Sequence, residues 1–278
     1  MCCGNVLCEI QKNYQKNNMK KIFLTLALAT VSSSAFAGGY RVALQGVRQA
    51  ALGGNSTTIA RDASVAFYNP AGLAFVDAKL SIAAGVFGVK SEARWQDPQT
   101  LNHATTDNGL STPIYLAVSY KPTDDLAIGL SVTTPFGSSL TWPNDWENRS
   151  YITEIELQAF NIQPTIAYKF TDWFSIGAGF IYTHGSATLN KVQTVAGNDI
   201  GLELEDKDAH GLGFNIGTMF RPTEKWNVAL AYRSNSEANA NYGAVRWSNV
   251  PTGLSTNPTF QTTEWKTSLP LPSEFVVG

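Results

Sequence analysis

Three short stretches of this chain are versions of one another: YKPTDDLAIG at residues 120–129, YKFTDWFSIG at 168–177 and FRPTEKWNVA at 220–229. The central threonines of successive copies lie 48 and 52 residues apart. Each copy has an aromatic residue closing one alternating segment, a short polar turn and a second alternating segment, which predicts a β-hairpin. Long polar segments separate the copies. Short turns at one end and long loops at the other, with aromatic residues at the strand ends, are typical of an antiparallel transmembrane β-barrel.

The strand-like segments alternate with a period of two residues, so their two faces can be read from the sequence. After the first turn, one face carries Leu126, Ile128, Leu130 and Val132, and the other carries Ala127, Gly129, Ser131 and Thr133. The same division recurs before the turn and in the segments around the other two copies.

A soluble β-sandwich also alternates, so the composition of the second face decides between the two architectures. That face is rich in Gly, Ala, Ser, Thr and Asn, whereas a solvated sandwich face usually carries Lys and Glu. Charged residues make up 15% of the chain and gather in predicted loops and turns. A Lys or Arg facing lipid at mid-membrane costs roughly 2 to 4 kcal/mol. Arg233 falls on the small and polar face, so we expect it to point into the barrel.

The first 37 residues have the features of a targeting segment. Residues 19–37 comprise a basic start, an apolar run of ten residues and Ala35-Phe36-Ala37, which together predict a cleaved signal peptide. The apolar run is too short to span a bilayer. Residues 1–18 are interpreted as an upstream extension, either untranslated or disordered, and they hold all three cysteines. We therefore expect a mature chain without thiol or disulfide chemistry.

The formal net charge of −2 argues against nucleic acid as a partner. No cofactor and no metal ion are indicated. The expected location is the outer membrane of a Gram-negative type of cell, with lipid and lipopolysaccharide around the barrel.

Residues 38–78 do not have the strand pattern. This segment starts with Gly38-Gly39-Tyr40 and leads to Asn69-Pro70-Ala71, followed by Gly and Leu. Proline fixes its own φ and disfavours helix at the residue before it, so Asn69 is expected in an extended or turn conformation. Taken alone, this motif predicts only a turn.

The order of these motifs between a signal peptide and the first strand resembles the amino-terminal plug of the long-chain fatty acid transporter family, of the FadL and TodX type. The resemblance continues through TPFG at 134–137, WENR at 146–149 and IQPTIAYK at 162–169. It implies a fourteen-stranded barrel, monomeric when complete, whose lumen is blocked by the plug.

The length of the chain limits how much of such a barrel it can form. Fourteen strands and a plug would need roughly 390 residues at the repeat spacing, whereas 241 follow Ala37. The pattern predicts strands near 79–90, 112–120, 125–134, 155–169, 173–188, 211–220 and 225–236, with an eighth from Ser273. Residues 79–278 are thus interpreted as the amino-terminal half of a longer barrel, with about seven to eight strands.

The resemblance also implies where a hydrophobic molecule would pass. In the family, a kink in the third strand opposite Asn-Pro-Ala opens the wall sideways. Here Pro135 cannot donate a ladder hydrogen bond and Gly137 follows, so the strand from Leu126 is expected to break at Pro135, Phe136 and Gly137. The alternative is that Pro135 merely ends the strand at the membrane surface.

Other parts of the site follow from the same comparison. Asn69, Pro70 and Ala71 would contact that break, and Gly38, Gly39 and Tyr40 would reach an inner binding site. Leu140, Trp142 and Trp146 would form an exposed capture loop for hydrocarbons, or a part of an interfacial aromatic girdle.

Three alternatives in the chemistry are weaker. Asp208-Ala209-His210 could belong to a hydrolase site, but a charged loop explains it better, and we expect no enzyme. The acidic run Glu203, Glu205, Asp206 and Asp208 could hold divalent cations among lipopolysaccharide head groups, although a solvated loop is the simpler interpretation. Gly211, Gly213 and Gly217 lack the spacing of a nucleotide loop and fit a strand that another backbone approaches closely.

The sequence thus predicts passive transport of hydrophobic compounds across the outer membrane, most simply of long-chain fatty acids. Aromatic hydrocarbons are the alternative substrates. A surface adhesin or structural barrel with a permanent plug is a rival of another class, and a hydrophilic porin is a third possibility.

Overall fold

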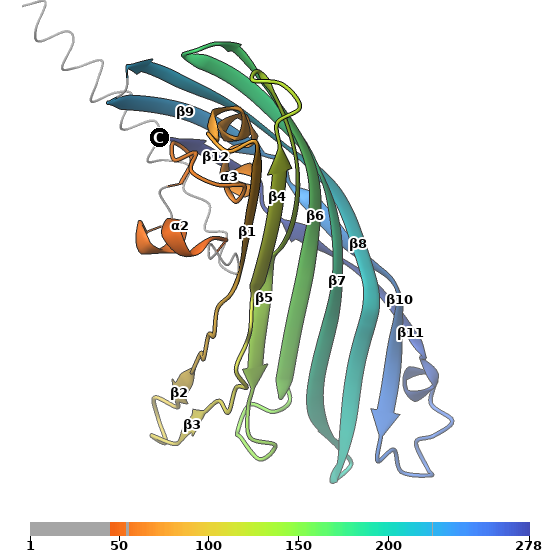
Figure 1. The fold of residues 1–278 in the computed structure, drawn as a ribbon. Coiled ribbons are helices and arrows are strands. Elements are labelled where there is room, and N and C mark those ends of the chain that lie inside the picture. Colours follow the sequence, from red (N-terminus) through yellow and green to blue (C-terminus); the bar gives the residue numbers. More distant parts are fainter. Residues whose placement is uncertain (1–44, 54–55, 224) are drawn as a thin grey trace, which may run out of the picture. The chain divides into compact units, whose positions relative to one another are not determined.

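The computed structural model describes residues 45–53, 56–223 and 225–278. Short helices come first and long antiparallel strands follow (Figure 1). The helical elements are α2 (Val47–Ala51), α3 (Val65–Tyr68) and the 3-10 helices η1 (Pro70–Phe75) and η2 (Pro258–Gln261). The strands are β1 (Leu80–Val86), β2 (Arg94–Gln96), β3 (His103–Thr105), β4 (Ile114–Tyr120), β5 (Leu126–Thr141), β6 (Glu154–Thr171), β7 (Phe174–Val195), β8 (Asn198–Thr223), β9 (Trp226–Arg233), β10 (Ser236–Ser248), β11 (Glu264–Leu271) and β12 (Glu274–Val277).

Ten of these strands form one open antiparallel sheet. Its order is β1-β4-β5-β6-β7-β8-β10-β11, while β9 pairs with β8 and β12. β9 and β10 follow each other along β8, and β12 continues the path of β11, so the described residues supply eight strand positions. β2 and β3 form a separate hairpin. The predicted all-β, antiparallel architecture with seven to eight strands is confirmed.

Several predicted strand ends were wrong. β7 and β8 run for 22 and 26 residues, so β8 begins at Asn198 rather than near residue 211. β10 was missed, and the eighth position begins at Glu264 rather than Ser273. A tilted strand crosses a membrane in about 9 to 11 residues. Beyond that length both faces meet water and the apolar alternation stops, so the extensions look like loops in the sequence.

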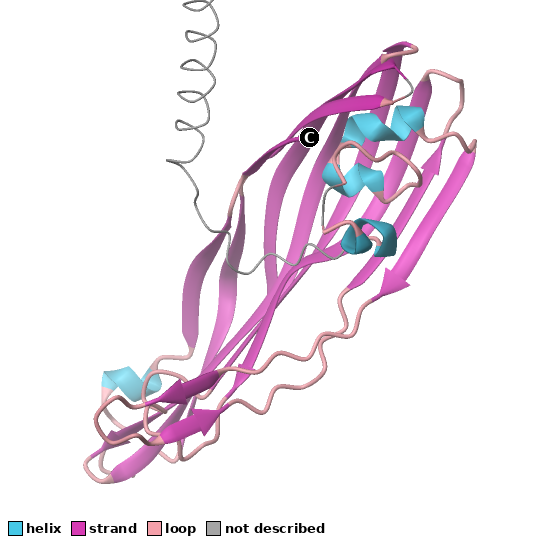
Figure 2. Ribbon diagram, turned by 90° about the vertical axis from the view of Figure 1, so that its left-hand side faces the viewer, coloured by secondary structure: helices cyan, strands magenta, loops and turns pink. Residues whose placement is uncertain are grey.

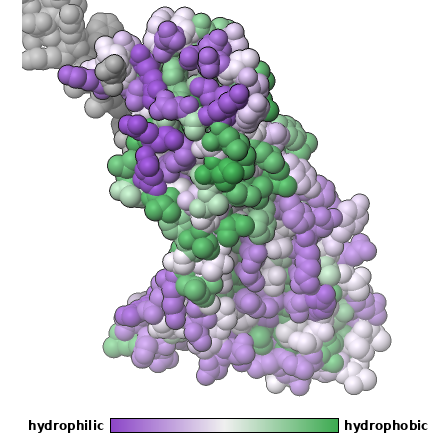
Figure 3. Space-filling model, viewed as in Figure 1, coloured by the Kyte–Doolittle hydropathy of each residue, from purple (hydrophilic) through white to green (hydrophobic). Residues whose placement is uncertain are grey.

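The two faces of the sheet divide as predicted. In β6, Ile162 and Ile166 are 40% and 53% exposed, whereas the intervening Gln163 and Thr165 are 1% and 6% exposed. Arg233 is 6% exposed and points inward, as expected. The exposed apolar side chains form a hydrophobic band between hydrophilic ends (Figure 3). This surface suits a lipid environment.

Aromatic rings gather at the short-turn end of the sheet. Phe174 stacks on Phe220 with ring centroids 4.7 Å apart, and Trp173 and Phe170 lie beside this pair. Amphipathic and aromatic rings are favoured at a membrane surface. This end of the sheet is called the short-turn end from here on.

The segment before β1, residues 45–53 and 56–78, is called the inner segment from here on. Its helices lie on the concave side of the sheet, where η1 packs against β5, β6, β7 and β8 (Figure 2). The ten-stranded sheet is called the wall from here on. The core that it shares with the inner segment is made of small and apolar side chains: Ala60, Val65, Ala66, Ala71, Leu73, Ala74, Phe75 and Val76 from the inner segment, with Ala127, Ala167 and Met219 from the wall. The sheet therefore buries its small-residue face against the inner segment.

Candidate functional site

Asn69 ties the inner segment to the wall. Its Nδ2 donates to the carbonyls of Thr57 at 3.0 Å and Thr218 at 3.2 Å, and its Oδ1 accepts the N–H of Ala71 at 3.1 Å. The hydroxyl of Ser175 donates to the carbonyl of Ala71 at 2.9 Å. Asn69 is completely buried, so these bonds satisfy polar groups that water does not reach.

Two glycines in the wall make this close approach possible. A Cβ at Gly177 would lie 2.4 Å from backbone atoms of Pro70 and Ala71. A Cβ at Gly217 would lie 2.1 Å from Oδ1 of Asn69. The prediction that Gly217 lies where another chain segment comes close is confirmed.

The predicted contact of Asn69, Pro70 and Ala71 with residues 135–137 is wrong. The motif docks on β7 and β8 instead, because the glycines there leave room for its backbone. The inner segment reaches β5 through Gln45, whose Nε2 donates to the carbonyl of Thr134 at 3.3 Å. Gly38, Gly39 and Tyr40 lie outside the described residues.

Three wall side chains hold the carbonyl end of α3. Gln163 donates to the carbonyl of Ala66 at 2.8 Å, Asn215 donates to that of Phe67 at 3.1 Å, and Arg233 also donates to Phe67. The guanidinium carbon of Arg233 lies 4.4 Å from the centre of the Phe67 ring. A helix leaves its last carbonyls without partners in the helix, and these side chains supply them.

Tyr68, the last residue of α3, adds a link within the inner segment. Its hydroxyl accepts the N–H of Gln45 at 3.2 Å. Burial raises the pKa of Tyr68 to about 12, because the phenolate would lose hydration. The tyrosine therefore remains neutral at physiological pH.

The prediction that β5 breaks at Pro135 is wrong. The strand carries a β-bulge there instead. Its ladder with β6 joins Thr133 to Asn161 and resumes with Phe136 and Ala159. Thr134 and Pro135 together therefore stand opposite the single residue Phe160. The strand continues to Thr141 because β6 supplies partners beyond the bulge. An extra residue in one strand shifts its course without ending it.

On the other side of β5, its pairing with β4 ends at the same level as the bulge. The ladder with β4 ends at the pair Tyr115 and Thr133, and Thr134 exchanges side-chain hydrogen bonds with Ile114. Backbone contact returns at Asp107 and Thr141. Between these points a cavity of about 680 Å³ interrupts the wall, and we call it the wall opening. Its lining includes the outward-facing Ile114, Leu110 and Phe160 and the inward-facing Phe136, Leu157 and Ala159.

A second cavity, of about 260 Å³, lies on the inner side of the sheet and is called the lumen cavity. It is lined mainly by apolar side chains, including Ile155, Leu189, Ala209, Ala238, Trp265 and Leu269. Both cavities are bounded by Phe136, Gly137, Leu157, Gln158 and Ala159. The β5 bulge thus forms a shared border between the lumen and the wall opening.

The long-loop end contains a tryptophan cluster. Trp142 and Trp146 stack with centroids 4.3 Å apart, and Trp95 meets Trp146 edge-on at 5.9 Å. Trp146 also donates to the carbonyl of Ile152. Because Trp146 is only 9% exposed, its predicted exposure for capture is wrong. Leu140, by contrast, lines the wall opening.

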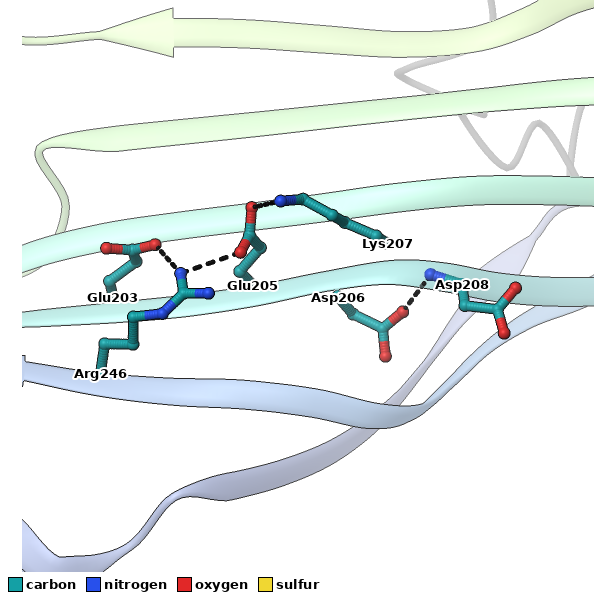
Figure 4. A network of polar contacts seen from close by, with 6 residues as sticks. All are labelled: Glu203, Glu205, Asp206, Lys207, Asp208 and Arg246. Atoms are coloured by element: carbon teal, nitrogen blue, oxygen red, sulfur yellow. Dashed lines mark hydrogen bonds and ion pairs between the residues drawn. The ribbon is translucent and has the colours of Figure 1, made fainter.

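The acidic run belongs to β8 rather than to a loop, as Figure 4 shows. Arg246 on β10 donates to Glu203 and Glu205, and Lys207 pairs with Glu205 at 2.7 Å. The two glutamates are therefore neutralised by protein cations. Asp206 instead accepts the N–H of Asp208.

His210, which was expected in the same charged loop, also lies in β8. His184 and His210 are opposite each other on β7 and β8, and the Nδ1 atoms lie 3.7 and 3.8 Å from Asp208. Among the described residues, no group of three or more His, Cys, Asp or Glu side chains has the arrangement of a metal site. No helix in this part of the chain is both long and apolar enough to cross a membrane.

An antiparallel sheet with an apolar outer band and a helical segment on its small-residue face defines an outer-membrane β-barrel protein with an internal plug. Residues 28–277 match the family described as outer membrane protein transport protein (OMPP1/FadL/TodX), and the chain belongs to this family. The family is one of transport channels, so the hydrolase alternative is set aside.

One relative in sequence and two solved structures are similar to this chain. The chain is 34% identical over 135 residues to the Neisseria meningitidis serogroup B outer membrane protein NMB0088, an alignment that covers 46% of this chain and 29% of the relative. The fold is similar to a Pseudomonas aeruginosa FadL homologue, with a TM-score of 0.65, 17% identity and coverage of 86% and 65% of the two chains. The fold is also similar to that of the Ralstonia pickettii toluene transporter TbuX, with a TM-score of 0.61 and 15% identity. This match covers 84% of this chain and 66% of TbuX. The chain therefore spans less than two thirds of the length of each of these proteins.

Proposed function

We propose that this protein carries hydrophobic compounds passively across the outer membrane, with long-chain fatty acids as the main substrate. A molecule would pass from the lumen cavity through the wall opening into the bilayer while the inner segment stays docked. Aromatic hydrocarbons are the second candidate class, because the similar fold of TbuX belongs to a toluene transporter.

The observation that carries the proposal is the border shared by the two cavities. Phe136 faces both, with 6% of its surface exposed, and Leu157 and Ala159 continue the apolar lining on β6. An apolar molecule on this route would exchange one apolar surface for another. Removing apolar area from water is worth about 25 cal/mol per Å², and the molecule would keep this gain throughout the passage.

The bulge gives a physical reason for the opening to lie at this point. Pro135 has no N–H, and the segment 109–113 is not paired with β5 by a ladder. Opening the wall here separates few backbone hydrogen bonds, each of which is expensive to lose in lipid. Elsewhere, as between β6 and β7, long ladders oppose separation.

The other predicted residues have roles within this proposal. Asn69, Pro70 and Ala71 anchor the inner segment rather than touch the opening, and Gly38, Gly39 and Tyr40 would approach the lumen cavity. Leu140 and Trp142 would contact a molecule near the outer end of the opening. Membrane lipid and lipopolysaccharide would surround a monomeric barrel.

Deletion of Pro135 tests the route. The bulge places two residues opposite one, so removing one restores a regular ladder and leaves both halves of β5 facing the same way. Pro135→Ala is the matched control because it keeps the extra residue. Uptake of radiolabelled oleate and toluene is measured in cells whose own channels have been removed, and barrel assembly is followed by heat-dependent electrophoretic mobility.

We expect the deletion variant to assemble and to lose uptake, and Pro135→Ala to retain most of it. Normal uptake by the assembled deletion variant would reject passage through the wall opening. Uptake by the parent protein of one substrate and not the other would identify the substrate class. A lack of uptake with retained binding to a surface partner would favour the adhesin, and ion conductance through planar bilayers would favour a porin.

A further inference from the structure

Three arginines surround one pocket at the short-turn end of the sheet. Arg48 and Arg61 come from the inner segment, and Arg221 comes from β8. The pocket has a volume of about 280 Å³. Its remaining lining consists of Leu52, Ile59, Ala60 and Asn227, so a cationic rim adjoins a small apolar surface.

The guanidinium of Arg221 is held in a defined position. Its Nε donates to Oδ1 of Asn227 at 3.1 Å, and its central carbon lies 4.7 Å from the centre of the Phe75 ring. Because one edge and one face are fixed, the terminal nitrogens are pre-organised as donors. An arginine fork of this kind matches the two oxygens of a carboxylate or phosphate.

In the part of the chain that the structure describes, no ion pair balances the positive charges of this pocket. Within residues 45–53, 56–223 and 225–278, no carboxylate lies within 4.0 Å of a nitrogen of Arg48, Arg61 or Arg221. The negative charge of Asp77 attracts the Arg221 guanidinium at longer range, and the positive charge of Arg61 repels it. Three cations around one pocket repel one another, and a bound anion would relieve this repulsion.

We infer that the three-arginine pocket binds the carboxylate of a fatty acid at the short-turn end, which faces the periplasm in barrels of this kind, with the first methylene groups against Leu52 and Ile59. This inference rests on the proposed function for its substrate class. The pocket shares no residue with the wall opening or the lumen cavity, so it is a separate site beside the sideways route. A neutral aromatic hydrocarbon has no group for the arginines, so the pocket selects an acyl anion over such a hydrocarbon. Inorganic phosphate shares the oxyanion chemistry but lacks the apolar part.

The test follows the Nε–H signal of Arg221 by NMR in ¹⁵N-arginine-labelled protein in detergent. Hexanoate, 1-hexanol and inorganic phosphate are the probes, because all three are soluble without forming micelles. We expect saturable shifts with hexanoate at a dissociation constant about tenfold below those for hexanol and phosphate. Arg61→Gln should weaken hexanoate binding about tenfold, and Arg61→Lys should recover part of it.

Arg149→Gln is the matched control, since Arg149 pairs with Asp199 at the long-loop end. It should leave hexanoate binding unchanged. Equal binding of hexanoate and hexanol, tighter binding of phosphate, or full binding by folded Arg61→Gln would each overturn the inference. The readout does not depend on transport: absence of oleate uptake together with selective hexanoate binding would reject the proposed function and leave the site in place.

Discussion

Replacing Gly177 by alanine tests the docking of the inner segment most sharply. The new Cβ would lie 2.4 Å from the carbonyl carbon of Pro70 and the nitrogen of Ala71, whereas ordinary contacts begin near 3.4 Å. Both atoms belong to the backbone and cannot turn aside. The start of η1 must therefore move by about 1 Å or separate from β7.

The cost follows from the contacts that this movement disturbs. Overpacking a tight contact costs about 1–3 kcal/mol. Weakening the hydrogen bond from Ser175 to Ala71 adds about 1 kcal/mol. Docking should therefore lose roughly 2–4 kcal/mol, which corresponds to a change of about 30- to 1,000-fold in the local opening equilibrium.

Hydrogen exchange of the amides in residues 69–76 measures this equilibrium. We expect the Gly177→Ala protein to exchange faster in this segment and to keep the protection of β6 and β7. Gly137→Ala is the control, because its Cβ would meet only the Leu157 carbonyl at an ordinary 3.6 Å. Equal exchange in both variants and the parent protein would refute the proposed contact between η1 and β7.

Three further changes test other parts of the structure. Arg233→Met keeps a side chain over Phe67 but removes its charged hydrogen bond, so α3 should lose about 2–3 kcal/mol of docking energy; unchanged hydrogen exchange at residues 65–68 would contradict this. Trp146→Ala should cost the loop cluster about 3–5 kcal/mol and remove the near-ultraviolet dichroism of its stack with Trp142, whereas a pure capture role would leave that signal intact. Tyr68→Phe should remove one tyrosine that ionises near pH 12. Because its pKa is raised on folding, the contribution of Tyr68 to stability is present below pH 10 and is lost as the pH rises toward 12; an absorbance titration that is the same in both proteins would rule this out.

The repeated turns and the alternating strands made the wall predictable. Period-two patterns such as that of Leu126 to Thr133 mark both the strand and its lipid face, because one face meets lipid and the other meets small packed residues. The charged stretch from Glu203 to Asp208 could not be recognised as strand. Outside the bilayer its cross-strand ion pairs with Arg246 replace apolar alternation, and those partners are distant in the sequence.

The candidate site was predictable only in part. Pro135 and Gly137 marked an irregularity in β5, but whether it was a break or a bulge depended on the partners that β6 supplies. The docking of Asn69 depended on space at Gly177 and Gly217, and the sequence gives no indication of which wall glycines face which segment. The alternation places three polar side chains on the inward-facing side of their strands: Gln163, Asn215 and Arg233. This position could have identified them as contacts between the wall and the inner segment.

Oleate uptake with the inner segment covalently fixed tests the central claim most directly. The Cγ of Asn69 lies 3.0 Å from the position of a Cβ at residue 217, so Asn69→Cys with Gly217→Cys can form a disulfide that holds the segment on β8. Sideways passage predicts equal uptake by the oxidised and reduced forms of this variant, because the wall opening remains free. Loss of uptake on oxidation, with recovery on reduction, would show that the inner segment must leave the wall and would contradict the account.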